Sequence, residues 1–133
     1  MTETLTDRLA RVNERIAGAC ARAGRDPGGV KLLAVTKIFP AEVIREAYQA
    51  GMREFGENYV QEMERKAPAV ADLAGARYHL IGHLQANKTK KAAELFGAID
   101  TVDSVKLAKR LDAEAVALDV MIDFVRQLAS EHE

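Results

Sequence analysis

The residue with the most useful chemistry is Lys37, at the end of the apolar segment of residues 30–36. Such a segment is typical of a strand covered on both faces, and α/β proteins place their chemistry at the carboxyl ends of such strands. Alternation puts Leu33, Val35 and Lys37 on one face. If that face is interior, burial favours the neutral amine, the form that condenses with an aldehyde. The alternative is a lysine that extends from a strand end into solvent.

Asn58 is the second polar residue at such a position, because it follows the short apolar stretch that ends at Phe55 and Gly56. Gly56 permits a tight turn, and the Asn58 amide can both donate and accept hydrogen bonds. Ligand binding and capping of the next helix fit the local sequence equally well.

His79 lies in a third apolar segment, where alternation places it on the face opposite to Tyr78. His79 and His83 have the four-residue spacing of metal ligands on a helix, but Gly82 and the strand pattern argue against a helix here. The local sequence also supplies no cysteine or acidic residue as a further ligand. We therefore expect no metal site.

The elements that must position these residues alternate along the chain. A helix is predicted over residues 4–23, with Thr4 and Asp7 as its capping box and Gly24 as its end. Strands are expected over residues 30–36, 52–55, 76–81 and 98–102, with helices beginning near Pro40, Glu57, Asn87 and Ser104, and with Pro68 beyond the end of the helix over 57–66. Repeated βα units predict an α/β fold with a parallel sheet, open or closed into a barrel. Residues 118–124 fit a fifth strand, but residues 116–128 also keep a helical spacing, so both readings stay open.

Bulk composition narrows the function classes. The 133 residues suit one domain over residues 1–133, and no apolar run approaches the roughly 20 residues that span a bilayer. The net charge of −1 gives no field to attract nucleic acid or an anionic membrane. Cys20 is the only cysteine and the N-terminus lacks a secretory pattern, so we expect a cytoplasmic protein without disulfides.

Three sequence blocks, over residues 32–37, 55–62 and 79–88, together resemble the pyridoxal phosphate homeostasis family. The likeness extends over residues 5–112 and implies a parallel (β/α) barrel similar to the N-terminal domain of alanine racemase. It also implies that pyridoxal 5′-phosphate is held as a Schiff base on Lys37, with Asn58 and His79 near the cofactor. The implied role is vitamin B6 homeostasis without catalysis, so no catalytic residue is assigned. The resemblance also allows partner enzymes that would receive the cofactor, but the residues of this chain do not identify them.

The sequence departs from this family in length. A complete eight-stranded barrel needs about 200–250 residues, whereas this chain supplies four or five βα units, so we expect an incomplete barrel from a truncated sequence. The family's phosphate-binding segments, similar to Ser-x-Gly-Met-Ser and Arg-Ile-Gly, do not occur, and Lys88 is the candidate substitute. Open strand edges would favour self-association. Two alternatives are a racemase-like enzyme and a fragment that has only an interaction role and binds the cofactor weakly.

Overall fold

Five parallel strands in chain order form the centre of the protein, in a computed structural model that describes residues 3–118 and 123–126. The strands are β1 (Ala34–Val35), β2 (Glu54–Glu57), β3 (Arg77–Leu80), β4 (Ala98–Val102) and β5 (Asp123–Arg126). Each strand from β2 to β5 pairs with the strand that precedes it in the chain. A doubly wound sheet would reverse this order at a switch point, so the order seen here is that of an incomplete barrel.

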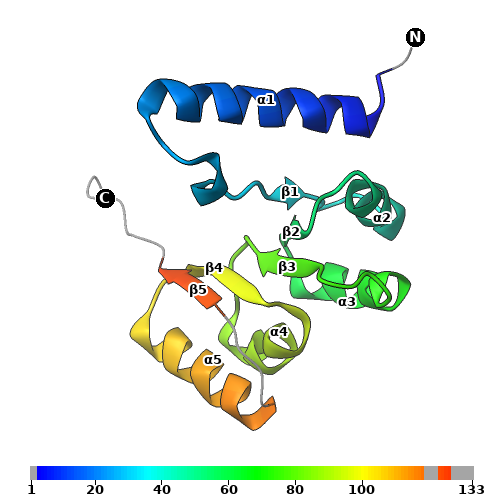
Figure 1. Cartoon of the computed structure of the whole chain (residues 1–133). Helices are drawn as coiled ribbons and strands as arrows, with labels where there is room; N and C mark the ends of the chain where they lie inside the picture. The colour runs from blue at the N-terminus through cyan, green and yellow to red at the C-terminus, as the bar shows by residue number, and fades with distance from the viewer. Residues whose placement is uncertain (1–2, 119–122, 127–133) are drawn as a thin grey trace.

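Four helices follow the curved row of strands on one side (Figure 1). They are α2 (Ala41–Gln49), α3 (Val60–Val70), α4 (Thr89–Leu95) and α5 (Val105–Leu118), and short 3₁₀ turns occupy Pro27–Gly29 and Ala86–Lys88. Helix α1 (Leu5–Ala23) lies at the β1 end of the row. Among the described residues, no helix covers the opposite side of the strands, which is the side that a closed barrel would enclose.

The strand register defines two faces of the sheet. Phe55 pairs with Tyr78 and their rings stack at 5.7 Å, while Phe55 and Leu80 are fully buried in the core with the helices. We call this side the helix face. Gly56 pairs with His79 one position along, so these residues belong to the other side, which we call the inner face.

Several sequence predictions are confirmed. Helix α1 begins with the Thr4 and Asp7 capping box and ends at Gly24, whose φ of 65° is left-handed. Strand β4 has the expected bounds, and the Ser104 hydroxyl accepts a hydrogen bond from the Leu107 N–H at the start of α5. These elements could be predicted because their signals are local.

Other predictions are corrected. Strand β1 is only Ala34–Val35, because its partner β2 begins at Glu54 and residues before position 33 have no strand opposite them. Pro68 lies inside α3 rather than beyond it, since the helix continues until Val70 is buried in the core.

The fifth strand exists as Asp123–Arg126 and pairs with β4, whereas the chain is helical up to Leu118. The remaining positions of the predicted tail, residues 119–122 and 127–133, lie outside the described residues. Within the described ranges, no helix is both long and apolar enough to cross a membrane.

Candidate functional site

Lys37 lies in an exposed turn directly after β1. The turn is closed by a hydrogen bond of 3.1 Å from the Phe39 N–H to the Thr36 carbonyl. The Lys37 amine has no hydrogen bond or ion pair with any residue that the structure describes. Of the two readings of Lys37, the structure has the lysine that extends from a strand end into solvent: the short β1 ends before Lys37, and the amine is open to solvent and to a ligand.

The peptide groups on both sides of Lys37 are held by buried side chains. The Thr36 carbonyl accepts a hydrogen bond of 3.0 Å from the Lys66 ammonium, and the Ile38 N–H donates one of 2.5 Å to Glu62 Oε1. Both partners come from α3, which lies on the helix face. Ile38 has a φ of 64°, which is unusual for a β-branched residue.

These side chains belong to a buried charged group that we call the helix-face cluster: Thr36, Glu57, Glu62 and Lys66. Lys66 Nζ lies 2.7 Å from Glu57 and 3.0 Å from Glu62, and the Thr36 hydroxyl donates to the other oxygen of Glu57. Each of the four residues is buried. Burial raises the pKa of Glu62, but hydrogen bonds from Lys66 and the Ile38 N–H outweigh it and leave that pKa below its usual value.

The spacing of residues on α3 contains a signal for this cluster. On α3 the buried residues include Met63 and Val70, and Lys66 lies between them at helical spacing. A lysine on the apolar face of a helix needs a carboxylate partner when it is buried. Glu62, four residues earlier on the same helix, is one such partner.

Asn58 follows the end of β2 and is half-buried. A Cβ added at Gly82 would lie 2.1 Å from the Asn58 carbonyl oxygen, so only glycine allows the two loops to approach this closely. Gly82 is also fixed from the other side, where its carbonyl accepts a hydrogen bond of 2.7 Å from the Thr101 hydroxyl. The close approach of the Asn58 backbone, rather than its side chain, therefore explains the glycine at position 82.

A cavity of about 360 Å³ with a mixed polar and apolar lining opens between these two loops. Its lining includes the Asn58 and Gln61 amides, His83 and Lys88. Lys88 is half-buried, and its ammonium has no hydrogen bond or ion pair with any residue that the structure describes. The arrangement offers amide donors and one cation at the carboxyl edge of the sheet, which suits an anionic ligand.

His79 lies in the middle of β3 on the inner face, between two carboxylates. Its Nδ1 is 3.1 Å from Asp100 and its Nε2 is 3.4 Å from Glu54. We call Glu54, His79 and Asp100 the inner-face cluster. Burial raises the pKa of Glu54, but Lys31 and His79 outweigh that effect and lower it overall. The fold therefore gives His79 two acidic neighbours that the local sequence does not supply. Even so, no group of side chains in the described part of the chain has the arrangement of a metal site.

The three predicted site residues come from adjacent strands but occupy two levels. Lys37 and Asn58 follow the ends of β1 and β2, at positions that the strand register places side by side. His79 pairs with Gly56, two residues before Asn58, and so lies about 7 Å lower along the sheet. The structure thus brings Lys37 and Asn58 to one edge and places His79 below that edge, on the inner face.

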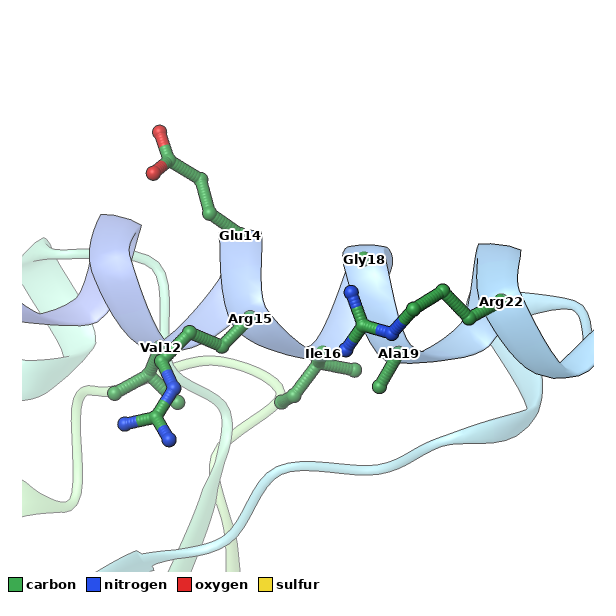
Figure 2. Close-up of a pocket in the computed structure, with 7 residues that line it drawn as sticks. All are labelled: Val12, Glu14, Arg15, Ile16, Gly18, Ala19 and Arg22. Carbon is green, nitrogen blue, oxygen red and sulfur yellow. The ribbon is translucent and has the colours of Figure 1, made fainter.

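A second cavity, of about 510 Å³, lies along α1 and contains none of the predicted site residues. Figure 2 shows Val12, Ile16 and Ala19 on one side of the helix, with the Glu14 carboxylate directed away from them. Arg15 and Arg22 flank this apolar stripe. It offers packing surface and no group that reacts with an aldehyde.

Comparison with known proteins agrees with the fold. The pyridoxal phosphate homeostasis protein of Pseudomonas aeruginosa is 46% identical over 114 residues, covering 86% of this chain and 49% of the relative. The protein of the same name from Escherichia coli K12 is 44% identical over 120 residues, covering 86% of this chain and 51% of the relative. The chain thus spans about half the length of these curated relatives. No protein-family model matches.

Solved structures show the same fold. PipY of Synechococcus elongatus with PLP bound has a TM-score of 0.71 and 46% identity, over 85% of this chain and 52% of PipY. A structure described as an unknown protein from Bifidobacterium adolescentis has a TM-score of 0.76 and 39% identity, over 90% of this chain and 52% of that protein. On these matches, the chain is a homologue of the pyridoxal phosphate homeostasis proteins over about half of their length.

Proposed function

We propose that this chain binds pyridoxal 5′-phosphate and contributes to vitamin B6 homeostasis, with the cofactor held covalently on Lys37. The observation that carries the proposal is an unpartnered, exposed lysine amine at the carboxyl end of β1. Its support is the likeness to pyridoxal phosphate homeostasis proteins, together with the similar protein PipY, which has been solved with PLP bound. When bound, the cofactor supplies an aldehyde that condenses reversibly with an amine and releases water.

The residues present suit the cofactor's two ends. The Lys37 amine is free to react, and the backbone on both of its sides is fixed by the helix-face cluster. The cavity beside Asn58 provides a place for an anionic group, with Lys88 as its cation. A phosphate requires cations or backbone N–H donors, so we assign Lys88 to phosphate binding and Asn58 to orientation of the ligand.

His79 receives a supporting role in this proposal. It is held between two carboxylates on the inner face, 21 residues before its partner Asp100. We propose that it shapes the inner face below the ligand without bonding to it. We further propose that the chain holds the cofactor without turning over amino acids.

The experiment that tests this proposal is chemical trapping. The purified chain is incubated with pyridoxal phosphate and reduced with borohydride, which transfers hydride to the imine and makes the bond permanent. Peptide mapping by mass spectrometry then locates the label. We expect Lys37 to carry most of it, and the Lys37→Arg variant to lose it.

Lys106 provides the matched control. It is an exposed lysine in the first turn of α5, four residues after β4 ends. It does not line the cavity beside Asn58, and its ammonium has no hydrogen bond or ion pair among the described residues. The Lys106→Arg variant should leave the label on Lys37 unchanged. Folded protein without label on Lys37 would contradict covalent binding there. Exchange of amino-acid Cα hydrogen with deuterated solvent above the rate with free cofactor would contradict the non-catalytic role.

A further inference from the structure

The turn that carries Lys37 contains a strained residue. Ile38 adopts a φ of 64° and is 79% exposed, so packing of its own side chain does not explain the conformation. A β-branched residue in this region is strained and persists only where surrounding groups impose the conformation. Strain of this kind calls for an external cause, which contacts from α3 supply.

The imposing contacts come from the helix-face cluster. Glu62 accepts the Ile38 N–H at 2.5 Å, and Lys66 donates to the Thr36 carbonyl at 3.0 Å. These two peptide groups flank Lys37 directly. Lys66 also lies 3.0 Å from Glu62, so one ion pair joins the two contacts.

The cluster is tied to β2 as well as to the turn. Lys66 lies 2.7 Å from Glu57 Oε1, and the Thr36 hydroxyl donates to the second oxygen of Glu57, which is fully buried. The Thr36 N–H completes the contact with a hydrogen bond of 2.9 Å to the Gly56 carbonyl. The backbone of the turn is thereby fixed relative to the strand that leads to Asn58.

We infer that Glu62 and Lys66 are positioning residues that hold the turn of residues 36–39 in its strained form, so that the Lys37 amine is presented at the carboxyl edge of the sheet. This inference rests on the proposed role of Lys37. Glu62 and Lys66 act through the two backbone groups that flank Lys37 and take no part in the bond to the aldehyde. Preorganisation of this kind speeds a reaction because the reacting group needs no rearrangement.

A stability role alone would not predict these particular contacts. A buried ion pair usually stabilises no better than apolar residues of similar volume, and Glu57 alone would neutralise Lys66. Glu62 adds a charged acceptor at the single N–H that follows Lys37. The location of this bond, at the strained residue, indicates control of the turn.

The test compares Glu62→Ala, Glu62→Gln and the matched control Glu64→Ala. Glu64 is on the same helix, and its contact is an exposed ion pair with Lys91 at 3.2 Å. Each variant is treated with pyridoxal, reduced with borohydride and mapped, and the labelling rate of Lys37 is divided by that of Lys106. Amide hydrogen exchange at Ile38 is measured on the same samples, and thermal unfolding reports the overall stability.

We expect Glu62→Ala to lower the Lys37 to Lys106 ratio by about tenfold or more, as loss of preorganisation does, and to speed exchange at Ile38. Glu62→Gln keeps an oxygen that accepts the Ile38 N–H, so it should restore most of both signals. Glu64→Ala should change neither. Because the ratio compares two lysines in one molecule, a general loss of stability would not reproduce this pattern.

Two outcomes would overturn the inference: an unchanged labelling ratio in Glu62→Ala, or unchanged exchange at Ile38. Either result, obtained while the unmodified chain labels Lys37 selectively, leaves the proposed function intact. Absence of selective labelling in the unmodified chain contradicts the proposed function instead. In that case, unchanged exchange at Ile38 would also contradict control of the turn by Glu62.

Discussion

The two faces of the sheet carry two charged clusters that differ in how they are satisfied. In the helix-face cluster, Lys66 joins two carboxylates and a backbone carbonyl, and all four members are buried. In the inner-face cluster, the Asp100 side chain is 28% exposed and Glu54 also faces Lys31, whose side chain is 65% exposed. Both clusters have a buried centre, but the inner-face cluster reaches solvent through Asp100 and through Lys31, the partner of Glu54.

This difference in solvent exposure indicates what each cluster can do. Charged groups that are shielded from water interact strongly, and the stability of each depends on all of its partners. The helix-face cluster can therefore impose a backbone conformation on the turn at Lys37. Charges near water are replaceable, so the inner-face cluster can line a surface without fixing one geometry. Removal of one member should therefore cost much more on the helix face than on the inner face.

The largest effect is expected from Lys66→Met. This change leaves Glu57 and Glu62 buried without their shared cation, which typically costs about 3–5 kcal/mol. The unfolding free energy in urea measures the loss. Lys91→Met is the control and should cost little, because the ion pairs of Lys91 with described residues, Glu64 and Glu94, lie at the surface. Equal losses in the two variants would contradict a special role for the buried cluster.

Thr36→Val should have the next largest effect. The hydroxyl donates to the buried Glu57 carboxylate, and a hydrogen bond to a charged group contributes about 2 kcal/mol. Thr89→Val is matched, since the Thr89 hydroxyl is also buried but donates to the neutral Ala86 carbonyl at 3.2 Å. It should cost about half as much. Urea unfolding of both variants checks the order, and a larger loss for Thr89→Val would reverse our interpretation.

His79→Leu should cost less, about 1 kcal/mol, because each carboxylate keeps another partner or water. Glu54 retains Lys31 at 3.1 Å, and Asp100 is open to solvent. His83→Leu serves as the control, with a side chain that is 73% exposed and 3.9 Å from Asp103. A loss in His79→Leu equal to that of Lys66→Met would show that the two clusters are equivalent and would remove the contrast between the faces.

Most of the fold could be predicted because its signals are local. The capping box of α1, the left-handed Gly24 and the apolar run of β4 each depend on residues that are close in sequence. The length of β1 could not be predicted this way, because it is set by where β2 begins. The interruption expected at Pro68 failed because tertiary burial of Val70 outweighed the local preference.

The candidate site was predictable only in part. Sequence identified Lys37 as the candidate amine but missed its surroundings, since Thr36 and Lys66 are 30 residues apart. The pairing of His79 with Asp100 also depends on strand register, across a separation of 21 residues. The positive φ of Ile38 has no local signal at all, because residue type argues against it.

The smallest predicted effect concerns pH, and it separates the clusters by their response to salt. Glu62 and Glu54 both have pKa values below the ordinary 4.5 in the folded protein. The unfolded chain therefore binds more protons in the window below that value. The stabilisation from each carboxylate is complete above pH 4.5 and is lost as the pH falls through the lower folded-state pKa.

Urea unfolding between about pH 3 and pH 6 measures this loss, and Glu62→Gln and Glu54→Gln should each flatten the dependence. At about 0.5 M salt the Debye length is roughly 4 Å, which screens exposed pairs much more than buried ones. The Glu54 contribution should therefore shrink in salt, because its partner Lys31 is largely exposed, while the Glu62 contribution should persist, because the Glu62 and Lys66 side chains are only 10% and 9% exposed. Equal sensitivity to salt would mean that water enters the helix-face cluster as freely as the inner one, and would weaken the argument that this cluster can hold the turn at Lys37.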